Sequence, residues 1–236
     1  MNEVKANTIP WMSYSVEFLS VFIAVIAAFA VNNRNDERKQ QNAQNKILTE
    51  IYFGLENDLE DIAINKYGHE GGNDALRFFK TMLSGEKVNV DSFPLHYFNL
   101  TRDFISIQNT TGYETLKSRG LELIDNDSLR KQIISLYEYH YAILEKFEET
   151  YSEAQFHDSY FQNINDILVP YMVFNKNQKL VGIEWPLQLS KVEKKEIMSY
   201  LWKIEVNRRV ILSFYPEIID NVKDIRSKIK EVIDID

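Results

Sequence analysis

The chain has 236 residues, a formal net charge of −8 and no cysteine. The missing cysteine excludes disulfides, thiolate catalysis and cysteine-based zinc sites, and the acidic balance would repel a phosphate backbone, so we expect no nucleic-acid partner. A hydrophobic share of 44% with only 8 glycines and 5 prolines can bury a core and favours helices over a turn-rich β fold.

The first element along the chain is an apolar run over residues 11–31, WMSYSVEFLSVFIAVIAAFAV. Its residues 18–31 are apolar except for Ser20. Together with the residues before them, they reach the length of about 20 residues that a helix needs to cross a bilayer. We therefore predict an N-terminal tail over residues 1–9 and a transmembrane helix over residues 10–33.

The flanks of this run fit a membrane interface. Trp11 and Tyr14 stand where an aromatic belt would lie, and Pro10 suits the first turn of a helix. Lys5 precedes the run, and more basic residues follow it, namely Arg34, Arg38, Lys39 and Lys46. The positive-inside rule then predicts a single pass through a bacterial inner membrane, with the C-terminal domain in the cytoplasm.

Two other interpretations of the run stay open at the level of sequence. A buried core helix of a soluble protein is one, although amphipathic helices seldom contain so long an apolar stretch. A cleaved signal peptide is the other, because Ala-Phe-Ala at residues 28–30 resembles a cleavage site and Lys5 is basic. Glu17 argues against a signal peptide, since it stands where such a peptide would carry basic charge.

One face of the predicted membrane helix carries small and polar side chains. At about 100° per residue, this face contains Glu17, Ser20, Ala24 and Ala28. Small residues at that spacing let two helix backbones approach closely, so we expect a homo-oligomer in the lipid bilayer. A carboxyl group in a membrane usually faces protein or water. Glu17 therefore fits either on the seam between helices or at the membrane surface, where its side chain would snorkel.

After residue 34 the sequence keeps a helical rhythm. Apolar side chains repeat at intervals of three and four residues, at Ile47, Leu48, Ile51, Tyr52, Leu55, Leu59 and Ile62. This period predicts a long helix over about residues 35–66. Gly68, Gly71 and Gly72 follow at once, and they predict the end of that helix.

Shorter elements are expected in the middle of the chain. Residues 73–83 have the pattern of a short helix, and residues 85–109 are mixed, which indicates a loop containing another short helix. Residues 111–119 predict a helix that Gly120 closes.

A second long helix is predicted over about residues 126–168, because apolar residues follow one face until Pro170. Asn126 or Asp127 would cap its N-terminus. Residues 171–189 surround an Asn-rich turn. A small hairpin is an option there, but we expect an extended crossing.

A third long helix is predicted over about residues 190–214, where Ser190 and Glu193 form a capping box. Pro216 should kink or interrupt it before a last helical stretch. The whole pattern predicts an all-α protein, in which the transmembrane helix is continuous with an antiparallel helical bundle over residues 34–236.

Two stretches of the sequence carry distinctive motifs, and they follow one another along the chain: EFLSVFIAVIAAFAVNNRNDERK at residues 17–39 and NTTGYETLKSRGLELIDNDSLRKQI at residues 109–133. Together they resemble an uncharacterised bacterial family of single-span membrane proteins, whose members share this anchor pattern and this succession of short helix, Gly turn and long helix. The chain has Asn-Asn-Arg at residues 32–34, where that family often has Asn-Asn-Trp. The resemblance implies a membrane anchor and a helical domain, and it implies no activity, because the family has none assigned.

Few residues indicate chemistry. Lys117 and Arg119 precede a predicted helix N-terminus and are weak candidates for binding an anion, although a structural turn explains them as well. Glu153 and His157 are one helical turn apart and could share a metal ion, although such a pair is more often an ordinary helix contact. The sequence has no metalloprotease, P-loop, dinucleotide-binding or nucleophile-elbow motif. We therefore predict no catalytic, cofactor-binding or metal residue.

These observations favour a non-enzymatic, single-pass membrane protein that self-associates and presents its helical domain to a protein partner as an interaction or scaffold module. A membrane-tethered helical bundle that senses a ligand is an alternative, because the bundle is rich in aromatic residues. A metal-dependent enzyme using Glu153 and His157 is the remaining alternative.

Overall fold

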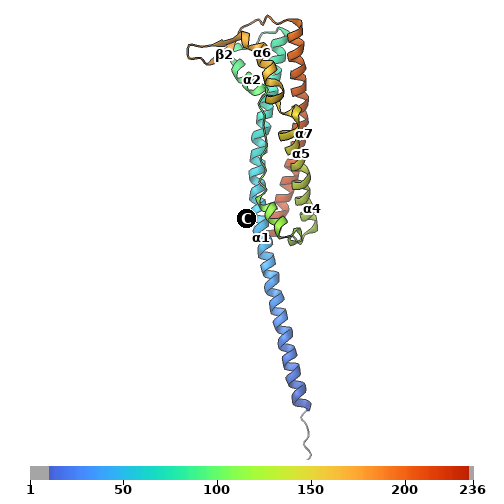
Figure 1. The fold of residues 1–236 in the computed structure, drawn as a ribbon. Helices are drawn as coiled ribbons and strands as arrows, with labels where there is room; N and C mark the ends of the chain where they lie inside the picture. The colour runs from blue at the N-terminus through green and yellow to red at the C-terminus, as the bar shows by residue number, and fades with distance from the viewer. Residues whose placement is uncertain (1–10, 234–236) are drawn as a thin grey trace, which may run out of the picture. The chain divides into compact units, whose positions relative to one another are not determined.

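A computed structural model describes residues 11–233, and it confirms that the chain is all-α, with one short hairpin among the described residues (Figure 1). The predicted tail over residues 1–9 and Pro10 lie outside the described residues. The chain divides into two compact units, residues 1–46 and residues 47–236.

Helix α1 extends over Trp11–Ser84 and belongs to both units. In the first unit its residues 15–42 are exposed. An 18-residue window near its N-terminal end has a mean hydropathy of 2.0, and none of that window is buried. By length and composition, α1 can therefore cross a membrane.

The prediction that α1 ends near residue 66 is wrong, because Gly68 and Gly72 lie within the helix and permit close packing. A Cβ atom at Gly68 would overlap the ring of Phe104, and one at Gly72 would overlap the guanidinium of Arg208. The predicted separate helix over residues 73–83 is part of α1. The helix ends instead at Gly85, whose φ of +89° is strained for other residues.

The next elements follow the prediction closely. A 3₁₀ turn, Val90–Ser92, leads into helix α2, Phe93–Leu100, and an extended segment then continues to Thr110. Helix α3, Thr111–Arg119, ends at Gly120 with a φ of +103°, which confirms that glycine as the stop signal.

The predicted continuous helix over residues 126–168 is wrong in its middle. Asn126 caps its start, as predicted, but the backbone turns extended at Tyr151. Several short helical pieces take its place: α4 Asp127–Ser135, π-helical η3 Leu136–Tyr141, α5 Ala142–Glu145, π-helical η4 Lys146–Thr150, 3₁₀ turn η5 Ser152–Ala154, π-helical η6 His157–Phe161 and α6 Gln162–Leu168.

The break near residue 151 is held by hydrogen bonds that a periodic pattern cannot indicate. The side chain of Gln155 donates to the carbonyl oxygen of Glu148 at 2.5 Å. The side chain of Asp103, from a distant part of the chain, accepts the N–H of Phe156 at 2.6 Å. These bonds satisfy backbone groups that an unbroken helix would pair internally.

After a 3₁₀ turn, Val169–Tyr171, the chain forms the hairpin. The prediction of an extended stretch without strand pairing over residues 171–189 is therefore wrong. Strand β1, Met172–Phe174, pairs antiparallel with β2, Leu180–Ile183. In Figure 1 the hairpin projects sideways beside α2 and α6.

Helix α7, Lys191–Ile233, begins at the predicted capping box, where the N–H of Ser190 donates to Glu193 and the N–H of Glu193 donates to the Ser190 hydroxyl. The predicted end near residue 214 is wrong, because α7 continues through Pro216. The exposed proline is flanked by side chains that lie in the core, Tyr215 and Ile218 among them. Their burial outweighs the lost helix hydrogen bond.

The second unit is a bundle in which α7 runs antiparallel both to the part of α1 after residue 46 and to the series α4–α6 (Figure 1). The extended segment that leads from α2 to α3 runs in the same direction as α7. The core comprises apolar side chains from all the long elements, including Leu48, Leu55, Phe79, Leu129, Leu144, Ile204, Tyr215 and Val222.

Candidate functional site

The extended segment over residues 101–110, called here the extended crossing, is bound by carboxylates. The N–H of Ser106 donates to Glu148 at 2.7 Å, and the N–H of Asn109 donates to Asp58 at 2.7 Å. Between them, the N–H of Ile107 donates to Asp61 at 2.8 Å. An extended segment without a partner strand leaves its amides unpaired, so side chains of α1 and η4 take the place of a neighbouring strand.

Two of these carboxylates are buried. Burial raises the pKa of Asp58 to about 6, although hydrogen bonds from Asn109 and the Tyr141 hydroxyl oppose the shift. Burial also raises the pKa of Glu148, against hydrogen bonds from Tyr215 and Ser106. A charged carboxylate is therefore held in the interior at neutral pH only because several donors surround it.

Arg208 of α7 is a fully buried cation. One of its terminal nitrogens donates to the carbonyl oxygens of Leu100 and Arg102, each at 3.0 Å, and to that of Asn99 at 3.3 Å. Its charged plane lies over the Phe156 ring, 4.3 Å from the centroid. Arg208 thus satisfies the carbonyl groups at the C-terminal end of α2, where a positive charge is favoured.

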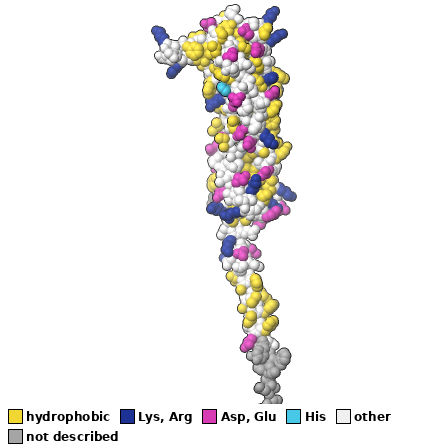
Figure 2. Space-filling model, viewed as in Figure 1, with side chains coloured by type: hydrophobic (Ala, Val, Ile, Leu, Met, Phe, Trp, Pro, Cys, Tyr) yellow, Lys and Arg dark blue, Asp and Glu magenta, His cyan; other side chains and the backbone are white. Residues whose placement is uncertain are grey.

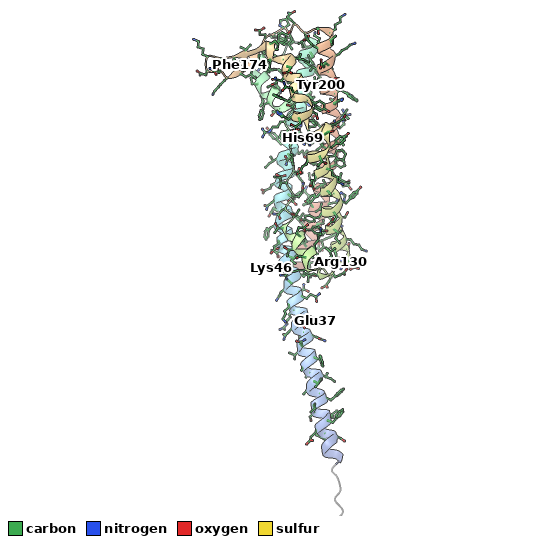
Figure 3. The ribbon with its side chains drawn as sticks, viewed as in Figure 1. Glu37, Lys46, His69, Arg130, Phe174 and Tyr200 are labelled. Carbon is green, nitrogen blue, oxygen red and sulfur yellow. The ribbon has the colours of Figure 1, made fainter. Side chains whose placement is uncertain are left out.

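His69 of α1, labelled in Figure 3, completes the contacts of Arg208. The other terminal nitrogen of Arg208 lies 2.9 Å from the Nδ1 of His69. Burial, and after it the positive charge of Arg208, together lower the pKa of His69 to about 3. The imidazole is therefore neutral and accepts this hydrogen bond. Burial lowers the pKa of Arg208 to about 10, so the guanidinium stays charged at neutral pH.

Two clefts share Arg102 as a lining residue. The aromatic cleft has a volume of about 500 Å³ and is lined in part by Tyr97, Phe98, Thr101, Arg102, His157 and Phe161. The acidic cleft has a volume of about 450 Å³ and is lined in part by Tyr67, Glu70, Asp74, His96, Arg102 and Phe104. Both volumes lie in the range of about 300–1,000 Å³ that is typical of small-molecule sites.

Arg102 therefore has access to two concave surfaces. Its guanidinium lies over the ring of Phe98, 4.8 Å from the centroid, and near the ring of Phe104 at 5.5 Å. A ligand in either cleft can therefore contact both an aromatic ring and the positive charge of Arg102. Within the described residues, no group of three or more His, Asp or Glu side chains is arranged to hold a metal ion.

The predicted self-association residues lie on the exposed first part of α1. Glu17, Ser20, Ala24 and Ala28 are all exposed. The Ser20 hydroxyl donates to the carbonyl oxygen of Val16 at 2.8 Å, which satisfies it within its own helix. Oligomerisation through this face stays a prediction.

The predicted anion candidates lie near the end of α3. The ammonium of Lys117 pairs with Glu138 at 3.0 Å and with Glu114 at 3.7 Å. The side chain of Asn126 already accepts the N–H groups of Ser128 and Leu129 at the start of α4. Anion binding by Lys117 and Arg119 stays a prediction.

Glu153 and His157 do not share a helical face as predicted, because the chain between them changes from a 3₁₀ turn to a π-helical segment. Glu153 lies 4.0 Å from Lys203, and the His157 ring stacks on Phe161 at 4.5 Å. The two side chains therefore have partners of other kinds.

Arg208, His69 and Arg102 are not among the residues predicted from the sequence. A signal existed for Arg208, since it lies in the buried stripe of α7 with Ile204, Ile211 and Tyr215 at helical spacing. A charge within such a stripe indicates a buried polar contact. We find no comparable signal for Arg102, which precedes an irregular segment.

Comparison with protein-family models, curated proteins and solved structures found no match to this chain. The resemblance of residues 17–39 and 109–133 to a family of single-span membrane proteins therefore stays a prediction.

Proposed function

We propose that this chain is a single-pass membrane protein whose helical domain serves as an interaction module. The observation that carries the proposal is the apolar, fully exposed surface of α1 between residues 15 and 31. Figure 2 shows hydrophobic side chains along this part of the helix.

The exposed area is large for a helix in water. The side chains of Phe18, Phe22 and Phe29 are 72%, 53% and 67% exposed. Covering apolar area is worth about 25 cal/mol per Å², and contiguous exposed apolar patches mark membrane or partner contacts. A bilayer covers every side of one helix, and all its backbone groups are paired internally.

Membrane anchoring is tested by cell fractionation with protease accessibility, using tags at both ends of the chain. We expect the protein in the membrane fraction after alkaline extraction, with the C-terminal tag protected in intact spheroplasts. Cleavage of the C-terminal tag would mean that the chain is anchored with its C-terminal domain on the outer side of the membrane. A chain found in the soluble fraction would disprove the anchor.

Self-association in the membrane is the second part of the proposal. Ala24 is central on the face that also carries Ser20 and Ala28, whereas Ala30 points about 120° away. Because the chain has no native cysteine, Ala24→Cys and Ala30→Cys each introduce a unique thiol. We expect oxidation in membranes to yield disulfide-linked dimers of Ala24→Cys and far fewer of Ala30→Cys. Equal yields of dimer, or no dimer from either variant, would contradict a helix–helix contact through the face that carries Ser20, Ala24 and Ala28.

Ligand sensing is a second candidate function, and the aromatic cleft favours it. The cleft combines about 500 Å³ of space with aromatic walls and the guanidinium of Arg102. Such a combination of apolar lining and a few polar groups is the usual form of a small-molecule site.

A further inference from the structure

The walls of the aromatic cleft match a flat ring. Tyr97 and Phe161 lie 5.8 Å apart between centroids, and His157 stacks on Phe161 at 4.5 Å. Phe98, on the same cleft, is 59% exposed. Aromatic rings attract one another in offset or edge-to-face contacts at about 4.5–7 Å, and the exposed ring of Phe98 is open to such a contact with a ligand ring.

The cleft also contains a cation with unused donors. Arg102 is exposed, and it contacts the rings of Phe98 and Phe104 rather than a carboxylate in the part of the chain that the structure describes. These ring contacts leave the N–H groups of Arg102 without an ion-pair partner among the described residues. A guanidinium matches a carboxylate with two parallel hydrogen bonds.

A second polar group lies beside Arg102. Thr101 borders the cleft and is only 3% exposed. Its hydroxyl has no hydrogen-bond partner among the described residues. Its oxygen is not one of the buried unpaired polar atoms among the described residues, so it is accessible from the cleft and can form a hydrogen bond with a ligand.

Two carboxylates also border the cleft, and neither prevents an anion from binding. Asp103 accepts the N–H groups of Phe156 and His157 and faces the positive charge of Arg208. Asp158 is exposed, so water and salt screen its charge. The acidic cleft also contains two carboxylates, Glu70 and Asp74, which are exposed and pair with Lys66 and Arg77. The two clefts therefore differ in their aromatic lining rather than in the number of carboxylates.

We propose that the aromatic cleft binds a small aromatic carboxylate, with the ligand ring against the wall formed by Tyr97, Phe98 and Phe161 and its carboxylate on Arg102 and Thr101. This site rests on the second candidate function and names its ligand class. It does not depend on the membrane anchor, because fractionation and ligand binding are separate measurements.

The test uses the full chain in lipid nanodiscs and ¹⁹F NMR of 4-fluorobenzoate, with empty nanodiscs as the blank. 4-Fluorobenzyl alcohol, which has the same ring and no charge, is the matched ligand. We expect saturable line broadening and a shift for the carboxylate at millimolar concentration, and at least about tenfold weaker binding for the alcohol, because the charge-assisted bond to Arg102 is lost.

Two arginine variants assign the site. Arg102→Gln should weaken 4-fluorobenzoate binding at least about tenfold, since it removes the cation from an exposed position without disturbing the core. Arg209→Gln, the control, removes another exposed guanidinium, on α7, and should leave binding unchanged. Circular dichroism confirms that both variants fold.

The proposal is overturned if 4-fluorobenzoate fails to bind, or if the alcohol binds equally well. It is also overturned if Arg102→Gln binds like the original chain, or if Arg209→Gln loses binding to the same extent as Arg102→Gln.

Discussion

At the scale of single residues, the bundle depends on polar groups that hold the extended crossing in place. Asp58 receives one hydrogen bond from the backbone of Asn109 and one from the hydroxyl of Tyr141. Glu148 receives bonds from Ser106 and Tyr215 in the same manner. Each carboxylate thus joins the crossing to a long helix, and each carries the cost of burying a charge.

Asp58 makes stability depend on pH. Its pKa is raised from 3.8 to about 6 in the folded state, so the folded chain holds this proton more tightly than the unfolded chain does. The stabilisation from this proton is fully present below about pH 4 and is lost as the pH rises through about 6. From this group alone, we expect the free energy of unfolding to fall by about 2 kcal/mol between pH 4 and pH 7.5.

The substitution Asp58→Asn isolates that effect. An asparagine keeps an acceptor for the Asn109 N–H and can donate to the Tyr141 oxygen, so the contacts persist without the charge. We expect the variant to be about as stable as the original chain at pH 4 and more stable at pH 7.5, measured by guanidinium unfolding of the full chain in detergent. Parallel pH curves for the two proteins would show that Asp58 is not the titrating group.

At the scale of elements, the continuity of α1 depends on which glycines touch a neighbour. Gly72 faces the buried Arg208, whereas a Cβ at Gly71 would meet only the amide nitrogen of Asn99, at 3.6 Å. The two glycines are adjacent on the same helix, and only one of them is needed for packing.

The substitutions Gly71→Ala and Gly72→Ala should therefore change stability in opposite directions. Alanine in a helix interior is favoured over glycine by about 0.5–1 kcal/mol, so Gly71→Ala should stabilise by that amount. Gly72→Ala should destabilise by about 2–4 kcal/mol, because it displaces a buried cation from its carbonyl acceptors. Denaturation midpoints of both variants are compared with the original chain. Stabilisation by both would mean that Arg208 moves aside without cost.

Those glycines also show how far sequence reasoning extends. Local signals predicted the helical fold, the caps at Asn126 and Ser190 and the stop at Gly120 correctly, because each depends on residues close together in the chain. Gly68 and Gly72 were misread as the end of a helix, since the residues that need their small size, Phe104 and Arg208, are distant in sequence.

The candidate site was harder to predict than the fold, for the same reason. The aromatic cleft takes its lining from α2, the start of the extended crossing and η6. The π-helical turns and the break near Tyr151 that place His157 beside Phe161 depend on distant hydrogen bonds, such as that from the Phe156 N–H to Asp103. The periodicity of residues 126–168 predicted instead a single regular helix.

At the scale of the whole molecule, the two units differ in what covers their apolar side chains. The buried core consists of residues from Ile47 onward, contributed by α1 and by the later elements. In the first unit the apolar side chains of residues 16–31 are exposed instead. The second unit therefore has the components of an independently folding domain, whereas the first unit has the exposed apolar surface on which the proposed membrane anchor rests.

Removing residues 1–41 tests that division. Because the core begins at Ile47, we expect the shortened chain to remain soluble without detergent and to show helical circular dichroism with cooperative unfolding. The full chain should need detergent or lipid under the same conditions, as judged by size-exclusion chromatography with light scattering. Leu144→Asp in the shortened chain, which buries a charge in the core, is the unfolded control. If the shortened chain resembled that control, residues 1–41 would belong to the fold of the bundle, and their apolar surface would no longer be available to a membrane.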